Sequence, residues 1–177
     1  MRIRSTIFAL AAAWIASVEP AWAIAGCDAF SNALRTEASD MQVEFGRAVV
    51  VSRTRSDSNV FDITTRVDVD ATLACRGDQF VRFEARIGEP ANARTTTNFE
   101  RFQSAALKAA LGWDGAKSRG VLKGMSADAV EYLAASRQRG DVYVAGKTEE
   151  HEPGGVSLGL IATGSDRTFV IVGPAGQ

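Results

Sequence analysis

The clearest pattern in the chain is an alternation of apolar and polar residues from Val60 to Cys75. Successive side chains of a β-strand point to opposite faces, so this two-residue period predicts one long strand, with one face on a core and the other in water. A helix, with its period of about 3.6 residues, would scatter the aspartates of this segment around its whole surface. The apolar face is formed by Phe61, Ile63, Thr65, Val67, Val69, Ala71, Leu73 and Cys75.

Two segments are expected to pair with this strand. Met41–Arg53 contains a β-branched run and Gly46, which is typical of a bulge or a bend. Val81–Ile87 alternates like the central segment. Because directly opposed residues share a face, odd positions pair with odd positions, and the loop after Cys75 should contain three residues (76–78) or five (76–80).

Helical patterns and further strands follow from spacing and from turn residues. The expected helices are Asp28–Ala38 with Asp28 as its cap, a segment from Thr97 or Asn98 to Leu111, and a segment from Ser126 to Gly140. The last three strands are expected at Val142–Lys147, Val156–Thr163 and Arg167–Val172. This order predicts an α+β domain, in which helices pack on one face of an antiparallel sheet made of a three-strand meander and three further strands. An OB-like barrel with an extra strand is the alternative.

The first 23 residues have the features of a signal peptide. Arg2 and Arg4 precede an apolar run, Ile7–Val18, and Ala21–Ala23 matches an A-x-A cleavage site. The run is shorter than the roughly 20 residues that span a bilayer. We therefore expect cleavage after Ala23, a periplasmic or secreted location, and a single mature domain over 24–177.

Two cysteines, Cys27 and Cys75, remain in the mature chain. In an oxidising compartment they are expected to form a disulfide, which would stabilise the fold by about 4 kcal/mol in the chain-entropy model. The stretch 24–27 also resembles a bacterial lipobox, in which Cys27 would carry a lipid anchor and Cys75 would be a free thiol. The disulfide is the favoured alternative, because Glu19 and Pro20 interrupt the apolar run well before Cys27, whereas a lipobox normally follows that run directly.

Charge excludes one class of partner. The mature chain retains 18 basic and 20 acidic residues, because Arg2, Arg4 and Glu19 leave with the signal peptide. General binding of nucleic acid requires a basic patch that displaces counterions from phosphates. A net charge of −2 without clustered basic residues argues against that function.

His151 and Ser157 are the first candidates for catalysis. Gly155–Gly159 matches the G-x-S-x-G nucleophile elbow, but a strand is expected after Ser157 where the elbow requires a helix. His151, the single histidine, lies in the acidic stretch 149–153, which is expected to form a solvated loop. Adjacent side chains point in different directions, so no metal site is expected there.

Carboxylates also gather on the polar face of the central segment. This face is expected to carry exposed cross-strand ion pairs rather than a catalytic acid, because arginines share it. Its charged residues are Asp62, Asp68, Asp70 and Glu84 with Arg66, Arg82 and Arg86. Two Arg-Gly-Asp tripeptides, 76–78 and 139–141, are explained by turns.

These observations favour an exported domain of the bacterial envelope that binds a protein or a small ligand without a cofactor. The alternative is a small periplasmic hydrolase that uses carboxylates or His151. An apolar pocket with converging Asp, Glu or His side chains would favour the enzyme. A filled core with a broad exposed apolar patch would favour the binding module.

Overall fold

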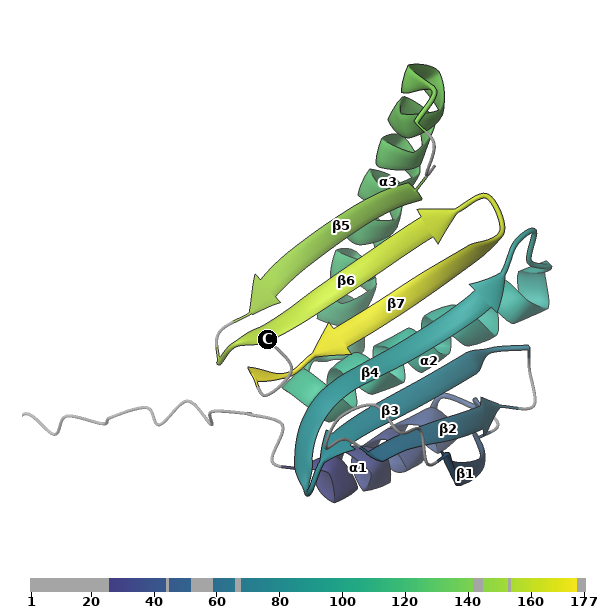
Figure 1. Cartoon of the computed structure of the whole chain (residues 1–177). Coiled ribbons are helices and arrows are strands. Elements are labelled where there is room, and N and C mark those ends of the chain that lie inside the picture. The colour runs from purple at the N-terminus through teal and green to yellow at the C-terminus, as the bar shows by residue number, and fades with distance from the viewer. Residues whose placement is uncertain are drawn as a thin grey trace, which may run out of the picture.

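The structure, a computed structural model, describes residues 26–43, 45–51, 59–65, 68–141, 145–152 and 154–174. The predicted signal peptide, 1–23, lies outside these residues. In chain order the elements are α1 (Cys27–Asp40), β1 (Phe45–Val51), β2 (Asn59–Thr65), β3 (Asp70–Arg76), β4 (Gln79–Gly88), α2 (Ala93–Leu111), α3 (Gly115–Arg139), β5 (Ala145–Glu152), β6 (Val156–Thr163) and β7 (Asp166–Val172) (Figure 1). None of these helices is both long enough and apolar enough to cross a bilayer.

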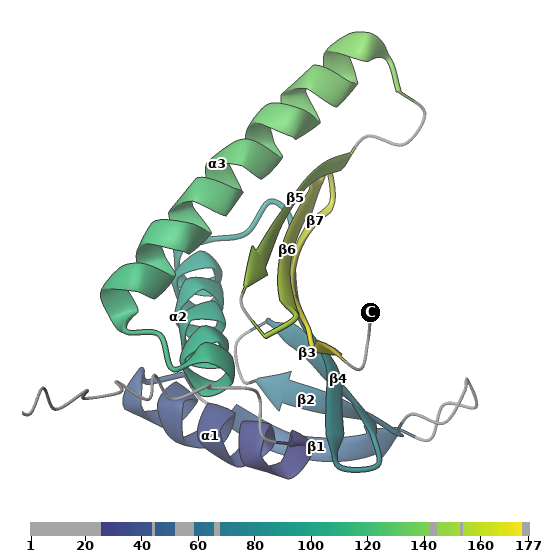
Figure 2. The same ribbon diagram turned by 90° about the vertical axis from the view of Figure 1, so that its left-hand side faces the viewer.

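The described strands form one antiparallel sheet of seven strands in the order β1-β2-β3-β4-β7-β6-β5. All three helices lie on one side of it (Figure 2). This confirms the α+β class with helices on one face of an antiparallel sheet. The OB-like barrel is wrong, since the described sheet is open and its edges are β1 and β5.

The segment 60–75, predicted as one long strand, is two strands joined by a turn. β2 and β3 pair with each other, with Phe61 opposite Leu73 and Thr64 opposite Asp70. The Thr65 hydroxyl closes the turn by donating a hydrogen bond of 3.0 Å to the Val69 carbonyl. A five-residue turn, 65–69, leaves odd positions on the same face in both strands, and the alternation therefore hides the turn. The meander before α2 consequently has four strands.

The turn between β3 and β4 differs from both predicted loop lengths. Arg76 pairs with Gln79 across two turn residues, of which Gly77 has a φ of +59°. The register then shifts between Ala74 and Cys75, and this bulge returns odd positions to odd partners. The bulge predicted near Gly46 is confirmed by a register shift in β1 between Phe45 and Ala48.

Two helices begin earlier than predicted because their caps precede the apolar repeats. The Asn92 side chain accepts the Thr95 N–H at 2.9 Å and starts α2. The Asp114 carboxylate accepts the N–H groups of Ala116 and Lys117 at 2.9 and 2.8 Å, and starts α3. α3 thus begins eleven residues before the predicted Ser126.

The core under α1 and α2 is built from aromatic rings. Phe83 of β4 is fully buried, with its ring centroid 5.5 Å from that of Phe30 and 5.6 Å from that of Phe102. The ring centroid of Phe80 lies 4.7 Å from that of Phe30. Tilted and edge-on ring pairs of this kind add to the stabilisation gained from burial.

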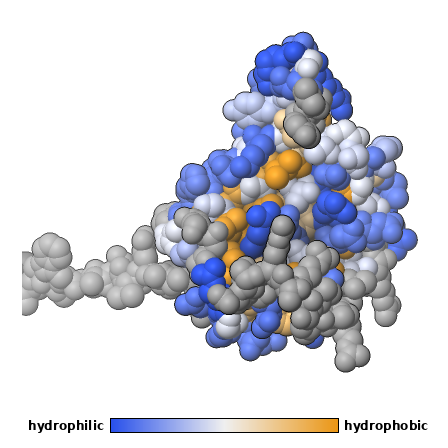
Figure 3. All heavy atoms as spheres, in the orientation of Figure 1, coloured by the Kyte–Doolittle hydropathy of each residue, from blue (hydrophilic) through white to orange (hydrophobic). Residues whose placement is uncertain are grey.

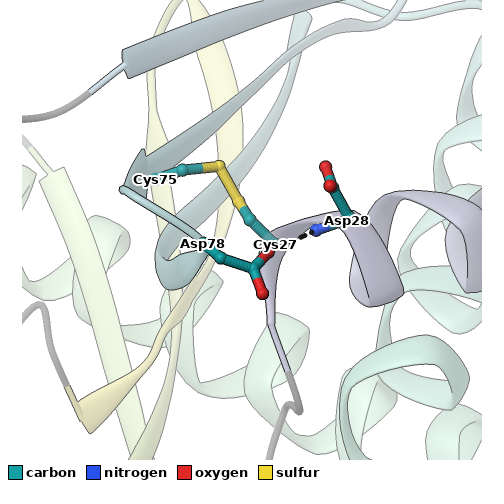
Figure 4. Close-up of a disulfide and its surroundings, with 4 residues drawn as sticks. All are labelled: Cys27, Asp28, Cys75 and Asp78. Carbon is teal, nitrogen blue, oxygen red and sulfur yellow. Dashed lines mark hydrogen bonds between the residues drawn. A yellow bond between two sulfur atoms is a disulfide. The ribbon is translucent and has the colours of Figure 1, made fainter.

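A disulfide joins Cys27 at the start of α1 to Cys75 at the end of β3, with the two Cα atoms 6.0 Å apart (Figure 4). This confirms the predicted bridge. The bridge occupies the sulfur atom that a lipid anchor would need.

Asp78, in the turn that follows, supports the same helix end. Its carbonyl accepts the Cys27 N–H at 2.6 Å, and its carboxylate accepts the Asp28 N–H at 3.4 Å. A Cβ on Gly26 would lie 2.7 Å from that carboxylate, so a larger residue at this position would force the Asp78 side chain to shift. Asp28, predicted as the cap, lies instead within the first turn of α1.

Candidate functional site

The two sequence candidates, His151 and Ser157, lie opposite each other on β5 and β6. His151 Nδ1 and Ser157 Oγ are 2.9 Å apart. The stretch 149–152, predicted as a loop, belongs to β5, because pairing with β6 outweighs the low strand propensity of its charged residues. Ser157 lies within a strand, as expected, and not at a strand-to-helix elbow.

This pair lacks the surroundings that acyl transfer requires. β6 is hydrogen-bonded to β5 on one side and to β7 on the other, so its ladder engages the backbone N–H groups that could stabilise an oxyanion. Glu149, on the same face, pairs with Lys147 at 2.7 Å, and the hydrogen bond and charge of Lys147 lower the pKa of Glu149. The arrangement is that of a polar cross-strand pair on an exposed face.

The rest of this helix-free face carries a cross-strand ion pair of the predicted kind, Arg86 with Asp70, and a pair within β4, Arg82 with Glu84. Arg82 and Glu84 are 3.0 Å apart, and Arg86 lies 3.8 Å from Asp70. Figure 3 shows this face with polar surface surrounding a smaller apolar area over β6 and β7. The described residues contain no group of three or more His, Cys, Asp or Glu side chains that could hold a metal ion.

The opposite face of the sheet holds a cavity of about 660 Å³, between α2, α3 and the strands β6 and β7. α2 and α3 each contribute one stripe of residues, and the sheet contributes its floor. Its lining residues are Phe99, Glu100, Gln103 and Ser104 from α2, Arg119, Leu122, Lys123, Ser126, Ala127 and Val130 from α3, Leu160 from β6 and Arg167 from β7.

The cavity has two causes: α3 packs closely on β5, and the side chains between α2 and α3 are small. α3 approaches β5 so closely at Gly146 that a Cβ there would lie 1.7 Å from the Ala129 carbonyl oxygen. Beside the cavity, the facing positions Ser104, Ser126 and Ala127 carry side chains too short to fill the space between the helices. The helix is therefore held at the sheet edge while a hollow remains next to α2.

Cations dominate the polar part of the lining. Arg119 and Lys123 lie one turn apart on α3, and both are exposed. Arg167 reaches the cavity from β7, and its Nε donates to Glu89. Glu100 is the single acidic lining residue. Three cations and one acid give the lining a formal charge of +2, whereas the whole chain carries −1.

This cavity is not predicted from the sequence, because the first half of α3 is not predicted either. The sequence predicts no more than one helical turn over 113–123, because Gly115 and Gly120 lower helix propensity there and Gly124 follows directly. A usable signal was present: Asp114 is a good N-cap, and 119, 122, 123, 126, 127 and 130 follow the spacing of one helix face.

Comparison with protein-family models, with curated proteins and with solved structures finds no match to this chain. No residue role is therefore transferred from a relative. The geometry of the cavity and of the His151–Ser157 pair carries the functional argument.

Proposed function

We propose that this protein is an exported, non-enzymatic binding module of the bacterial envelope, and that it holds a small, partly apolar ligand in the cavity between α2 and α3. The single observation that carries the proposal is the cavity itself. Its volume of about 660 Å³ falls within the range of about 300–1,000 Å³ that is usual for ligand pockets. The lining contains one carboxylate and no histidine, so neither paired carboxylates nor His151, the groups of the hydrolase alternative, lie in it.

The compartment rests on two features. The predicted signal peptide directs the chain to the periplasm or the exterior. The Cys27–Cys75 bridge agrees with an oxidising compartment, and it competes with lipidation of Cys27 for the same sulfur. We therefore favour a soluble exported protein over a lipoprotein.

Binding of a neutral fluorescent probe, N-phenyl-1-naphthylamine, tests the proposal. We expect the mature protein to bind it with increased emission, and Ser126→Trp, which fills the space between the helices, to weaken binding at least tenfold. Ala145→Trp adds the same side chain on the opposite face of the sheet and should leave binding unchanged. Absence of binding to the native protein, or equal binding by both variants, would contradict the proposal.

A hydrolase is the second candidate, and the 2.9 Å contact between His151 and Ser157 favours it. In this case the protein should hydrolyse p-nitrophenyl acetate above the background rate of free imidazole. Both Ser157→Ala and His151→Ala should abolish that activity while the fold stays intact. Activity that survives Ser157→Ala would exclude serine as the nucleophile.

A further inference from the structure

We infer that the ligand of this cavity is a single-chain amphiphile with an anionic head, of the fatty-acid type, bound as a monomer. The inference rests on the proposed function and adds the chemical class of the ligand. The head is assigned to Arg119 and Lys123 at the mouth, and the chain to the apolar surface between the helices.

The charges at the mouth select an anion. Like charges four residues apart on a helix repel each other, so the Arg119–Lys123 pair opposes helix formation. A carboxylate between them removes this repulsion and gains charge-assisted hydrogen bonds, for which guanidinium geometry is well suited. Arg167 adds a third cation whose charge is partly balanced by Glu89. With Glu89 and the lining residue Glu100 both counted, the three cations still leave a formal charge of +1.

The apolar part of the lining matches a hydrocarbon chain. Phe99, Leu122 and Leu160 are buried below the mouth, and Val130 remains 55% exposed at its edge. An exposed large apolar residue beside a cavity is a surface that an apolar ligand can cover. Burial of one methylene group corresponds to about a fourfold gain in affinity. Affinity should therefore rise with chain length until the cavity is full.

A monomeric ligand fits the shape better than a membrane surface does. A helix that lies in a membrane interface presents a wide apolar face to the lipid. Across the described residues, the exposed large hydrophobic side chains are Val130 and Tyr132, both on α3. Two such residues do not form an apolar face of that width, whereas the cavity offers a single chain a place between two helices and the sheet.

Titration calorimetry on the mature protein, below the micellar concentration, tests the chemistry. We expect dodecanoate to bind about sixteenfold more tightly than decanoate, two methylene groups shorter. Dodecanoate should also bind at least tenfold more tightly than dodecyltrimethylammonium, and less tightly as salt is added. Equal binding of the anionic and the cationic chain would overturn the inference while leaving the proposed function standing.

A paired variant locates the head group. Arg119→Gln with Lys123→Gln should weaken dodecanoate about tenfold and leave N-phenyl-1-naphthylamine unchanged. The control, Arg86→Gln with Lys147→Gln, removes two cations from the other face of the sheet and should change neither affinity. Dodecanoate binding unaffected by the first pair, or binding to phosphatidylglycerol vesicles without binding to monomeric dodecanoate, would overturn the inference. If the native protein does not bind N-phenyl-1-naphthylamine, the proposed function itself is refuted.

Discussion

α1 and α2 cover the sheet around β4 with fully buried phenylalanine rings, whereas α3 covers β5 and β6 and leaves a cavity beside α2. The first region is tied by the Cys27–Cys75 bridge and by an ion pair of 2.6 Å between Lys108 and Glu37. In the second region the close contact is a backbone approach at Gly146. The difference separates a part of the fold that is filled by side chains from a part that leaves open the space in which we propose that a ligand binds.

The same truncation made on both sides is expected to give the largest contrast. Leu34→Ala removes a fully buried side chain from α1 and should lower the free energy of unfolding by about 3–5 kcal/mol. Leu122→Ala removes the same atoms from the cavity lining, where part of the surroundings is already open, and should cost about 2 kcal/mol or less. Urea unfolding measures both values. Equal losses would mean that the two regions are packed alike.

Removal of the disulfide, which lies in the first region, should cause the second-largest loss in the free energy of unfolding. Cys27→Ala with Cys75→Ala should cost about 2–4 kcal/mol, because the bridge closes a loop with a sequence separation of 48. Guanidinium unfolding of the variant and of the oxidised protein gives the difference. N-phenyl-1-naphthylamine should still bind the folded variant, since the bridge lies away from the cavity. A variant as stable as the oxidised protein would show that the bridge contributes nothing to stability.

Gly146→Ala tests the contact that holds α3. The new Cβ would collide with the backbone of Ala129, so we expect a loss of about 1–3 kcal/mol. Gly88→Ala is the matched control in β4, where a Cβ meets nothing within 4 Å, and should stay within about 0.5 kcal/mol of the native value. Thermal unfolding distinguishes the two, and a neutral Gly146→Ala would show that α3 is free to move.

The glycines in the first half of α3 give a smaller effect of opposite sign. Gly120→Ala and Gly124→Ala place a Cβ in open space and should each stabilise the protein by about 0.5–1 kcal/mol. Thermal unfolding measures the gain. A loss of stability would mean that these positions face a neighbour.

The cap of α3 should produce the weakest effect, visible only in acid. Backbone hydrogen bonds from Lys117 and Ala116 lower the pKa of Asp114 below its usual 3.8. The folded-state pKa is thus below the unfolded one, so the cap stabilises the protein above pH 3.8 and its contribution is lost as pH falls below that value. Asp114→Asn keeps a capping side chain that does not titrate, and should lack this part of the acid dependence. Thermal unfolding of the two proteins as a function of pH tests it, and parallel curves would contradict it.

The fold class followed from alternation and turn residues, but alternation could not count strands. An odd-numbered turn preserves face parity, so a hairpin and one long strand share the same pattern over 60–75. The length of that segment argues against a single strand, because strands rarely exceed about ten residues. The turn contains neither glycine nor proline, and among its described residues Asp68 has a positive φ, +27°.

The candidate site was less accessible from sequence. His151 and Ser157 were singled out, and their proximity depends on a β5–β6 register that the acidic stretch 149–152 concealed. Arg119 and Lys123 were overlooked because three glycines obscured their helix. A cavity depends on the space that neighbouring elements leave unfilled. The periodicity of residues within one element does not predict that space.

The capping of α1 by Asp78 has a consequence for the order of folding. A helix of 14 residues is marginal in water by itself, and this one has no side-chain cap of its own at Gly26. The groups that secure its first turn come from a hairpin some fifty positions later in the chain. We therefore expect α1 to be stable only after the β3–β4 hairpin has formed. Although α1 is synthesised before the hairpin, it should become stable after it.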